Sequence, residues 1–130
     1  MSTRAVYTFT DNRNVFHVYK HHDGYPMEAA RSILAALPLA WPLPRFEPDE
    51  FAAAFVAANK SQPGGVRLCP SGTFAEIAPL DVEYHYIVRQ HFHTLRVFAY
   101  ALEGKNRAEH LIFDGTPEQF AAWAKEQQAA

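Results

Sequence analysis

The sequence predicts an α+β fold: an antiparallel sheet of about five or six strands with helices packed on one face. Three observations carry this prediction. Strand-like and helix-like segments follow one another in the order ββααββββα, the helices stand in a pair or alone rather than between strands, and two pairs of strands are joined by short turns. The chain shows no internal repeat and no linker, so we expect a single domain over residues 1–130.

The first half of the chain is predicted to form a hairpin and two helices. RAVYTF and VFHVYK, rich in β-branched and aromatic residues, flank the turn-forming TDNRN and form the hairpin. A helix begins at Pro26 and ends before Pro38, and proline-rich residues 38–48 form an extended connector. A second helix begins at Pro48 and ends at SQPGG. The apolar residues at helical spacing in these two helices are Ala30, Ile33, Leu34, Leu37, Phe51, Ala54, Phe55 and Ala58.

The second half supplies most of the sheet and the last helix. A short strand is predicted at GVRLCP and a final short strand at HLIFD. Between them, a long hairpin that turns across residues 90–93 is predicted from DVEYHYIVRQ and HTLRVFAYAL. The C-terminal helix has the clearest start signal, since Thr116 is an N-cap, Pro117 occupies the first helical position and Gln119 completes a capping box.

Composition excludes several classes of protein. The chain is 48% hydrophobic and 20% charged with a formal net charge of −2, so it is expected to fold and to attract neither duplex nucleic acid nor an anionic membrane. The single cysteine, Cys69, excludes an intramolecular disulfide and a multi-cysteine zinc site. Without an apolar run of about 18 residues or a signal peptide, we expect a cytoplasmic protein.

Two histidine clusters are candidates for chemistry. His21, His22 and Asp23 precede a glycine, which favours an Asx-type corner over a metal or catalytic site, with one histidine on a binding rim. His91 and His93 are two residues apart, a spacing that places both on the same side of a strand, but no third metal ligand lies at a recognised spacing. This favours a solvated turn. We therefore expect no metal and no cofactor.

Sequence motifs favour binding over catalysis without settling the choice. The chain has no GxSxG elbow, no Walker A motif and no GxGxxG loop, and Cys69 lies beside a proline at a strand end. No catalytic residue is predicted.

The two long strands suggest a ligand-binding face. Small aliphatic residues are expected to face the helices, which would leave tyrosines and arginines free to stack on a planar base and to pair with a phosphate or carboxylate. The same residue types also cover subunit interfaces. The predicted ligand-binding residues are Tyr84, Tyr86, Arg89, Arg96 and Tyr100, with Tyr19 and His22 on the rim. Lys20, Arg45, Lys60 and Arg67 stand near element ends, where loops bring some of them to a shared rim.

STRAVYTF at 2–9, HVYKHHDGYP at 17–26 and FDGTPEQFAAWA at 113–124 resemble a group of small proteins encoded by phages and prophages. The HHDGYP-like corner after the first hairpin is the mark of that group, for which no catalytic residues are established. Small phage proteins of this size often inhibit host defence, so the resemblance implies a counter-defence binding protein.

Three functions remain open at this stage. The first is an oligomeric protein, most simply a homodimer with a shared pocket, that sequesters a small phosphorylated or nucleotide-like ligand. The second is an inhibitor that binds a host defence protein through an aromatic-rich face. The third is a small histidine-dependent or metal-dependent hydrolase, which requires converging ligands or a histidine within reach of a nucleophile.

Overall fold

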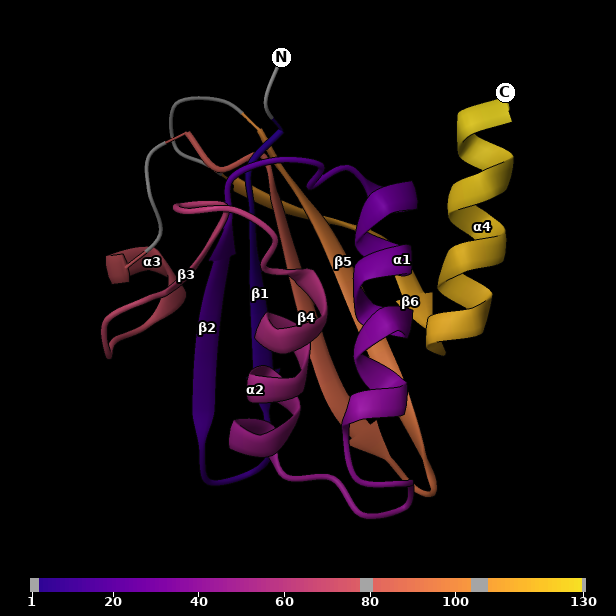
Figure 1. The fold of residues 1–130 in the computed structure, drawn as a ribbon. Helices are drawn as coiled ribbons and strands as arrows, with labels where there is room; N and C mark the ends of the chain where they lie inside the picture. The colour runs from indigo at the N-terminus through magenta and orange to yellow at the C-terminus, as the bar shows by residue number, and fades with distance from the viewer. Residues whose placement is uncertain (1–2, 78–80, 104–107, 130) are drawn as a thin grey trace.

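One six-stranded sheet, covered on one face by three helices, forms the framework of the computed structural model (Figure 1). The structure describes residues 3–77, 81–103 and 108–129. The strand order is β3-β2-β1-β4-β5-β6. The strands are β1 (Ala5–Thr10), β2 (Val15–Lys20), β3 (Val66–Leu68), β4 (Tyr84–His91), β5 (Thr94–Glu103) and β6 (Ala108–Gly115). The helices are α1 (Pro26–Ala36), the 3-10 helix η1 (Leu37–Leu39), α2 (Pro48–Asn59), α3 (Phe74–Ile77) and α4 (Pro117–Ala129).

The α+β class, the strand number and the placement of α1, α2 and α4 on one face agree with the sequence prediction, but the sheet is mixed. Four neighbouring pairs are antiparallel, whereas β1 and β4 at the centre are parallel, with Ala5 opposite Tyr84. The expectation of a purely antiparallel sheet is therefore wrong. The chain leaves β2, crosses the helical face through α1 and α2, adds β3 at the edge, and re-enters the sheet beside β1 from the end where β1 begins.

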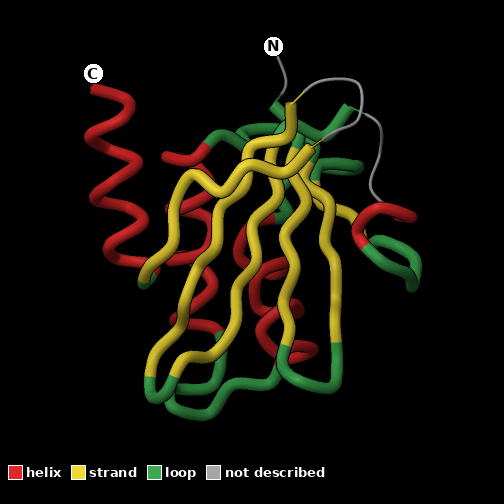
Figure 2. Tube along the Cα trace, turned by 180° about the vertical axis from the view of Figure 1, so that it is seen from behind, coloured by secondary structure: helices red, strands yellow, loops and turns green. Residues whose placement is uncertain are grey.

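Helices α1, α2 and α4 cover the same face, and the opposite face is open apart from the region near α3 (Figure 2). The core lies on the covered face, where Tyr7 packs against Phe55 and Tyr86 with ring centroids 4.5 and 5.1 Å apart. Phe120 of α4 contacts Tyr86 from the other side, with centroids 5.7 Å apart. Aromatic rings from two strands and two helices thus fill the space between the layers.

The HHDGYP corner is a structural joint. Asp23 adopts a left-handed backbone conformation with φ 57°, and Gly24 is buried against β1. A Cβ atom at Gly24 would lie 2.7 Å from the Cβ of Ala5, so only glycine fits without movement. The hydroxyl of Tyr86 donates a 2.6 Å hydrogen bond to the Gly24 carbonyl, which ties the corner to β4.

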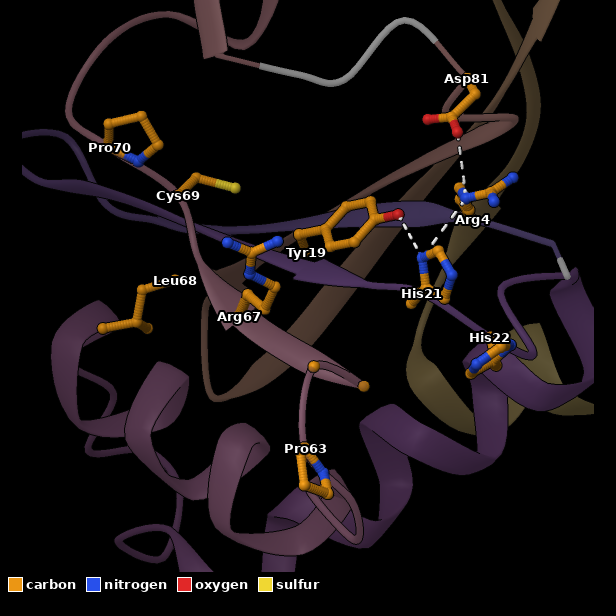
Figure 3. Close-up of a pocket in the computed structure, with 12 residues that line it drawn as sticks. Arg4, Tyr19, His21, His22, Pro63, Arg67, Leu68, Cys69, Pro70 and Asp81 are labelled. Carbon is orange, nitrogen blue, oxygen red and sulfur yellow. Dashed lines mark hydrogen bonds and ion pairs between the residues drawn. The ribbon is translucent and has the colours of Figure 1, made fainter.

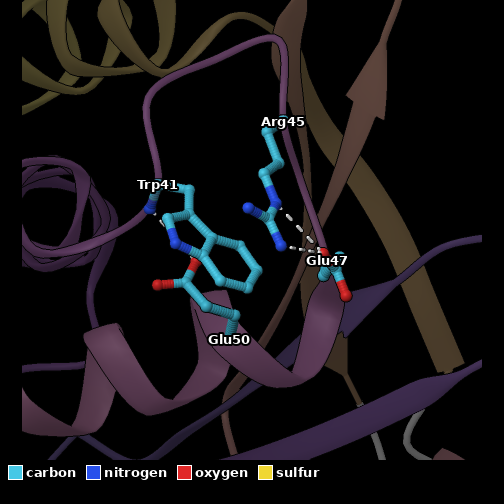
Figure 4. A network of polar contacts seen from close by, with 4 residues as sticks. All are labelled: Trp41, Arg45, Glu47 and Glu50. Carbon is cyan, nitrogen blue, oxygen red and sulfur yellow. Dashed lines mark hydrogen bonds and ion pairs between the residues drawn. The ribbon is translucent and has the colours of Figure 1, made fainter.

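The proline-rich connector is not extended throughout, because it contains η1 and a turn at 43–44, where the backbone N–H of Arg45 donates to the Pro42 carbonyl at 3.2 Å. A small polar network holds it against the body (Figure 4). The guanidinium carbon of Arg45 lies 3.2 Å from the centroid of the Trp41 ring, and Arg45 also pairs with Glu47 at 3.1 Å. The backbone N–H of Trp41 donates to the Glu50 carboxylate at 3.2 Å. These contacts fix the path of the connector into α2.

Within the described residues, the helices are all too short or too polar to cross a bilayer.

Two elements were not predicted from the sequence, namely η1 inside the connector and the short helix α3 after β3.

Candidate functional site

The structure splits the predicted ligand-binding residues between the two faces of the sheet. Tyr86 is fully buried beneath the helices, and Tyr84 lies on the same side with its ring stacked on that of Tyr86 at 5.9 Å. The expectation that these two tyrosines lie on the open face is wrong, although Tyr84 is partly exposed at the edge of the covered face. In the register of the β4–β5 pair, Tyr86 lies opposite Ala99, so the tyrosines share the face of the small aliphatic residues of β5.

Arg89, Arg96 and Tyr100 do lie on the open face, as predicted. Arg96 is paired with Asp114 of β6, and Arg89 donates to the side chain of Asn12 at 3.4 Å. Tyr100 is partly buried beside His85. These three residues do not line the pocket that holds Tyr19 and His22, so they do not form one site with them.

That pocket lies at the β2–β3 end of the sheet and has a volume of about 640 Å³ (Figure 3). Tyr19 of β2 and Arg67 of β3 are opposite each other in the strand register, so their side chains are neighbours on the open face. Figure 3 shows the Arg67 guanidinium near the Tyr19 ring. Gly64, with φ 76°, turns the chain from α2 into β3 and thereby brings Arg67 to this position.

A polar cluster forms the other side of the pocket. Arg4 pairs with Asp81 at 3.0 Å, and its Nε atom also lies 3.4 Å from Nδ1 of His21. The hydroxyl of Tyr19 is 2.7 Å from the same nitrogen. Since an arginine N–H can only donate, Nδ1 of His21 acts as an acceptor, and neutral His21 carries its proton on Nε2. Arg4 and Asp81 meet because the parallel strands β1 and β4 begin at the same end of the sheet.

Arg67 is the cation of this pocket with no carboxylate partner among the described residues. Its positive charge favours the ionised forms of Tyr19 and Cys69, but burial dominates and raises the pKa of both. Cys69 is therefore a thiol at neutral pH rather than a reactive thiolate. The arrangement suits binding of an anion better than nucleophilic chemistry.

Of the four cations expected at element ends, only Arg67 lines the pocket. Arg45 lies in the connector network, Lys20 donates to the His22 carbonyl at 2.8 Å, and Lys60 lies near the carbonyl of Val66 at 3.4 Å. His91 and His93 are exposed in the β4–β5 turn, as predicted.

A buried polar row crosses the open face next to the pocket. The hydroxyl of Thr8 lies 2.7 Å from Nδ1 of His17 and 2.7 Å from Nε2 of His85. Nδ1 of His85 is in turn 2.7 Å from a carboxylate oxygen of Glu109. The row therefore runs from β2 through β1 and β4 to β6.

The carboxylate of Glu109 determines where the protons of this row lie. Because a carboxylate accepts, neutral His85 has its proton on Nδ1, and its Nε2 accepts from the Thr8 hydroxyl. The Thr8 oxygen then accepts from Nδ1 of His17, which leaves Nε2 of neutral His17 unprotonated. That nitrogen is buried and has no hydrogen-bond partner among the described residues.

The order Thr8, His85, Glu109 has the distances of a nucleophile, a base and an orienting carboxylate. However, Thr8 and His85 are only 4% and 3% exposed, and the ring of Phe74 from α3 stacks on His85 with centroids 3.8 Å apart. A substrate cannot reach this hydroxyl in the structure. Among the described residues, no three histidine, cysteine or acidic side chains are arranged to hold a metal ion.

An apolar groove of about 620 Å³ lies on the other side of segment 68–72, between the edge of β2 and helix α2. Val15 and Leu68 on its walls are 54% and 77% exposed. Asp49 is the charged residue among those that line it.

Comparison with known protein families found no match, and searches of curated proteins and of solved structures found none either.

Sequence reasoning identified Tyr19, His22 and Arg67 as candidates but missed Arg4 and Asp81 of the same pocket. These two lie far apart in the chain and meet only through the parallel pairing of β1 with β4, for which the sequence carries no local signal. The His17–His85 row was also missed, although both histidines stand on predicted strands at positions that alternate with apolar residues.

Proposed function

We propose that the protein binds a small phosphorylated or nucleotide-like ligand in the pocket between Tyr19, His21 and Arg67. The observation that carries this proposal is Arg67, which lies beside an aromatic ring in a pocket of about 640 Å³ and has no carboxylate partner in the part of the chain that the structure describes. That volume is within the range of small-molecule sites. Arginine binds phosphate through two parallel N–H donors, and tyrosine offers a ring for stacking.

The remaining polar groups of the pocket fit the same class of ligand. The positive charge of Arg4 is compensated by Asp81, so the phosphate is assigned to Arg67 and the Asp81 carboxylate is left to accept hydroxyl or amino groups of the ligand. The chain as a whole carries a net charge of −2, so the attraction for an anion is local to this pocket.

The biological role that we attach to this binding is sequestration of the ligand as a phage counter-defence protein. It is supported by the resemblance of the STRAVYTF, HVYKHHDGYP and FDGTPEQFAAWA segments to small phage proteins. A homodimer would deepen a pocket that lies at a sheet edge.

Isothermal titration calorimetry with nucleoside phosphates, sugar phosphates and their unphosphorylated counterparts tests the proposal. We expect phosphorylated compounds to bind at least about tenfold more tightly than their counterparts, because the arginine–phosphate contact is worth roughly 1.5–3 kcal/mol. The Arg67→Gln variant should lose that preference.

Arg31→Gln is the matched control. Arg31 is an exposed arginine on α1 that pairs with Glu28, outside the pocket, so its removal should leave binding unchanged. Equal affinity for phosphorylated and unphosphorylated compounds, or equal loss in both variants, would contradict the proposal.

A second candidate function, inhibition of a host protein by direct binding, is favoured by the apolar groove beside Val15 and Leu68. Exposed apolar side chains at a sheet edge are typical of protein contacts. Light scattering of the wild type and of Leu68→Asp at matched concentrations tests whether a second copy fills the groove instead. A wild-type dimer that Leu68→Asp converts to a monomer would show that the groove binds a second copy of the chain. Monomers in both cases would leave the groove free to bind a different protein.

A further inference from the structure

Segment 69–76 connects the buried histidines to the wall of the proposed ligand pocket. Cys69 donates its backbone N–H to the carbonyl of His17 at 3.1 Å, and the Phe74 ring stacks on the imidazole of His85. The Gly72 backbone favours the protonated form of His17, but burial has the larger effect and lowers the pKa of His17. Cys69 and Pro70, at the start of the segment, line the pocket. A change that weakens the contacts of His17 and His85 with this segment therefore also changes the shape of the pocket.

The covered histidines bind a proton weakly. His17 and His85 are 9% and 3% exposed, and burial lowers the pKa of both. Glu109 acts in the opposite direction on the pKa of His85, but its influence is smaller than that of burial. When the cover is lifted, the imidazoles regain ordinary hydration, so a proton binds more tightly to the uncovered form.

Around the row, Tyr100, Cys69 and Glu76 keep their charge between about pH 5 and 7. Burial raises the pKa of Tyr100 on β5 and of the Cys69 thiol after β3, and hydrogen bonds with Thr73 lower that of Glu76 on α3. Glu109 of β6 is the carboxylate that faces the row. A change of protection in this pH range is therefore assigned to the histidines.

We propose that the row His17–Thr8–His85–Glu109 is a proton-sensitive latch, in which protonation of His17 or His85 releases segment 69–76 and opens one wall of the ligand pocket. The release itself involves no ligand, whereas its effect on affinity rests on the proposed function. Acidification would then weaken ligand binding.

Hydrogen–deuterium exchange of the ligand-free full chain, at about pH 7.5 and about pH 5.5 and corrected for intrinsic rates, tests the latch. The hydrogen-bonded amides of Cys69, Thr73 and Glu76 should lose about tenfold or more of their protection at the lower pH, and those of β4 and β5 should keep theirs. In His85→Gln the protection of the segment should be less dependent on pH, whereas His91→Gln, an exposed histidine in the hairpin turn, should behave as the wild type.

Glu109→Gln provides a second variant in case His85→Gln does not fold. The amide oxygen still accepts from His85, but the charge that favours the imidazolium is lost, so release should require a lower pH. Unchanged protection of the Cys69, Thr73 and Glu76 amides in the wild type, or an equal loss throughout the sheet, would overturn the latch.

Titration with sulfate, whose charge is constant over this range, tests the link to the pocket. Between about pH 7.5 and 5.5 the wild type should lose at least about threefold in affinity relative to His85→Gln. If neither sulfate nor the phosphorylated compounds bind at either pH, the proposed function fails while the exchange experiment still decides the latch. If sulfate binds and its affinity changes equally with pH in the wild type and in His85→Gln, regulation of the pocket by the latch is refuted.

Discussion

The covered and open faces of the sheet both carry aromatic rings, but those of Tyr7 and Tyr86 lie in the core, whereas that of Tyr19 on the open face lies in a pocket beside charged groups. Beneath the helices, Tyr7 and Tyr86 are fully buried and their rings pack against other rings. On the open face, Tyr19 is partly exposed, its hydroxyl contacts His21, and its neighbour across the strands is Arg67. Aromatic content alone therefore does not distinguish the two faces, whereas on the open face the Tyr19 ring neighbours Arg67, a cation with no carboxylate partner among the described residues.

The sharpest way to break this comparison is to remove one tyrosine from each face. Tyr86→Ala should lower the free energy of unfolding by about 3–5 kcal/mol, because it opens a cavity in the core. Tyr100→Ala on the open face should cost no more than about 1.5 kcal/mol. Urea unfolding measures both, and similar losses would contradict the assignment of the faces.

A smaller effect is expected at the corner that joins β2 to α1. In Gly24→Ala, the new methyl group would lie 2.7 Å from the Cβ of Ala5 and 2.8 Å from the carbonyl oxygen of Thr3, which should cost about 1–3 kcal/mol. Gly65→Ala is the matched control, since its nearest contact is the flexible side chain of Gln62, and it should change stability by about 0.5 kcal/mol at most. A Gly24→Ala protein as stable as the control would show that the corner is not tightly packed.

Stability should also depend on pH through the buried histidines of the open face. The pKa of His17 and of His85 is lower in the folded than in the unfolded chain. Between the folded and the unfolded pKa values, the unfolded chain therefore binds more protons than the folded chain. The free energy of unfolding therefore keeps its full value above the unfolded histidine pKa of about 6.5. Below that pH it falls by at most about 1.4 kcal/mol per pH unit for each histidine. Urea unfolding between about pH 7.5 and 5.5 should show a smaller slope for His85→Gln than for the wild type. An unchanged slope would mean that His85 does not titrate differently on folding.

Much of the fold follows from local patterns, and the rest depends on contacts between distant segments. The start of α4 at Pro117, the hairpin of β1 and β2 and the end of α1 before Pro38 were predicted because caps, turns and prolines act on their neighbours. The parallel pairing of β1 with β4 was not, because the alternation of side chains is the same in either direction.

The candidate site was only partly predictable for the same reason. Tyr19 and Arg67 stand at the ends of recognisable strands, so both could be proposed as contacts. The faces of Tyr84 and Tyr86 could not be assigned, because both sides of β4 carry large side chains and the register with Ala99 is a long-range property. The pocket itself needs Arg4 and Asp81, which the chain brings together only when folded.

The smallest effect is expected in the connector, away from both faces. Trp41→Ala removes the ring under the Arg45 guanidinium and should destabilise the protein by about 0.5–1 kcal/mol, the usual value of an exposed cation–π contact. Ligand binding should be unchanged, because Trp41 does not line the pocket. Thermal unfolding and calorimetry check the two expectations separately, and a loss of affinity would place part of the site outside the β2–β3 end.

The most direct test of the central claim is to map where a phosphorylated ligand binds, by NMR titration of the labelled protein with the tightest compound of the calorimetric panel. The account predicts that the largest shifts fall on Tyr19, His21, Arg67 and Cys69 and disappear in Arg67→Gln. Shifts centred instead on Arg96 and Tyr100, or on the apolar groove beside Val15, would contradict it.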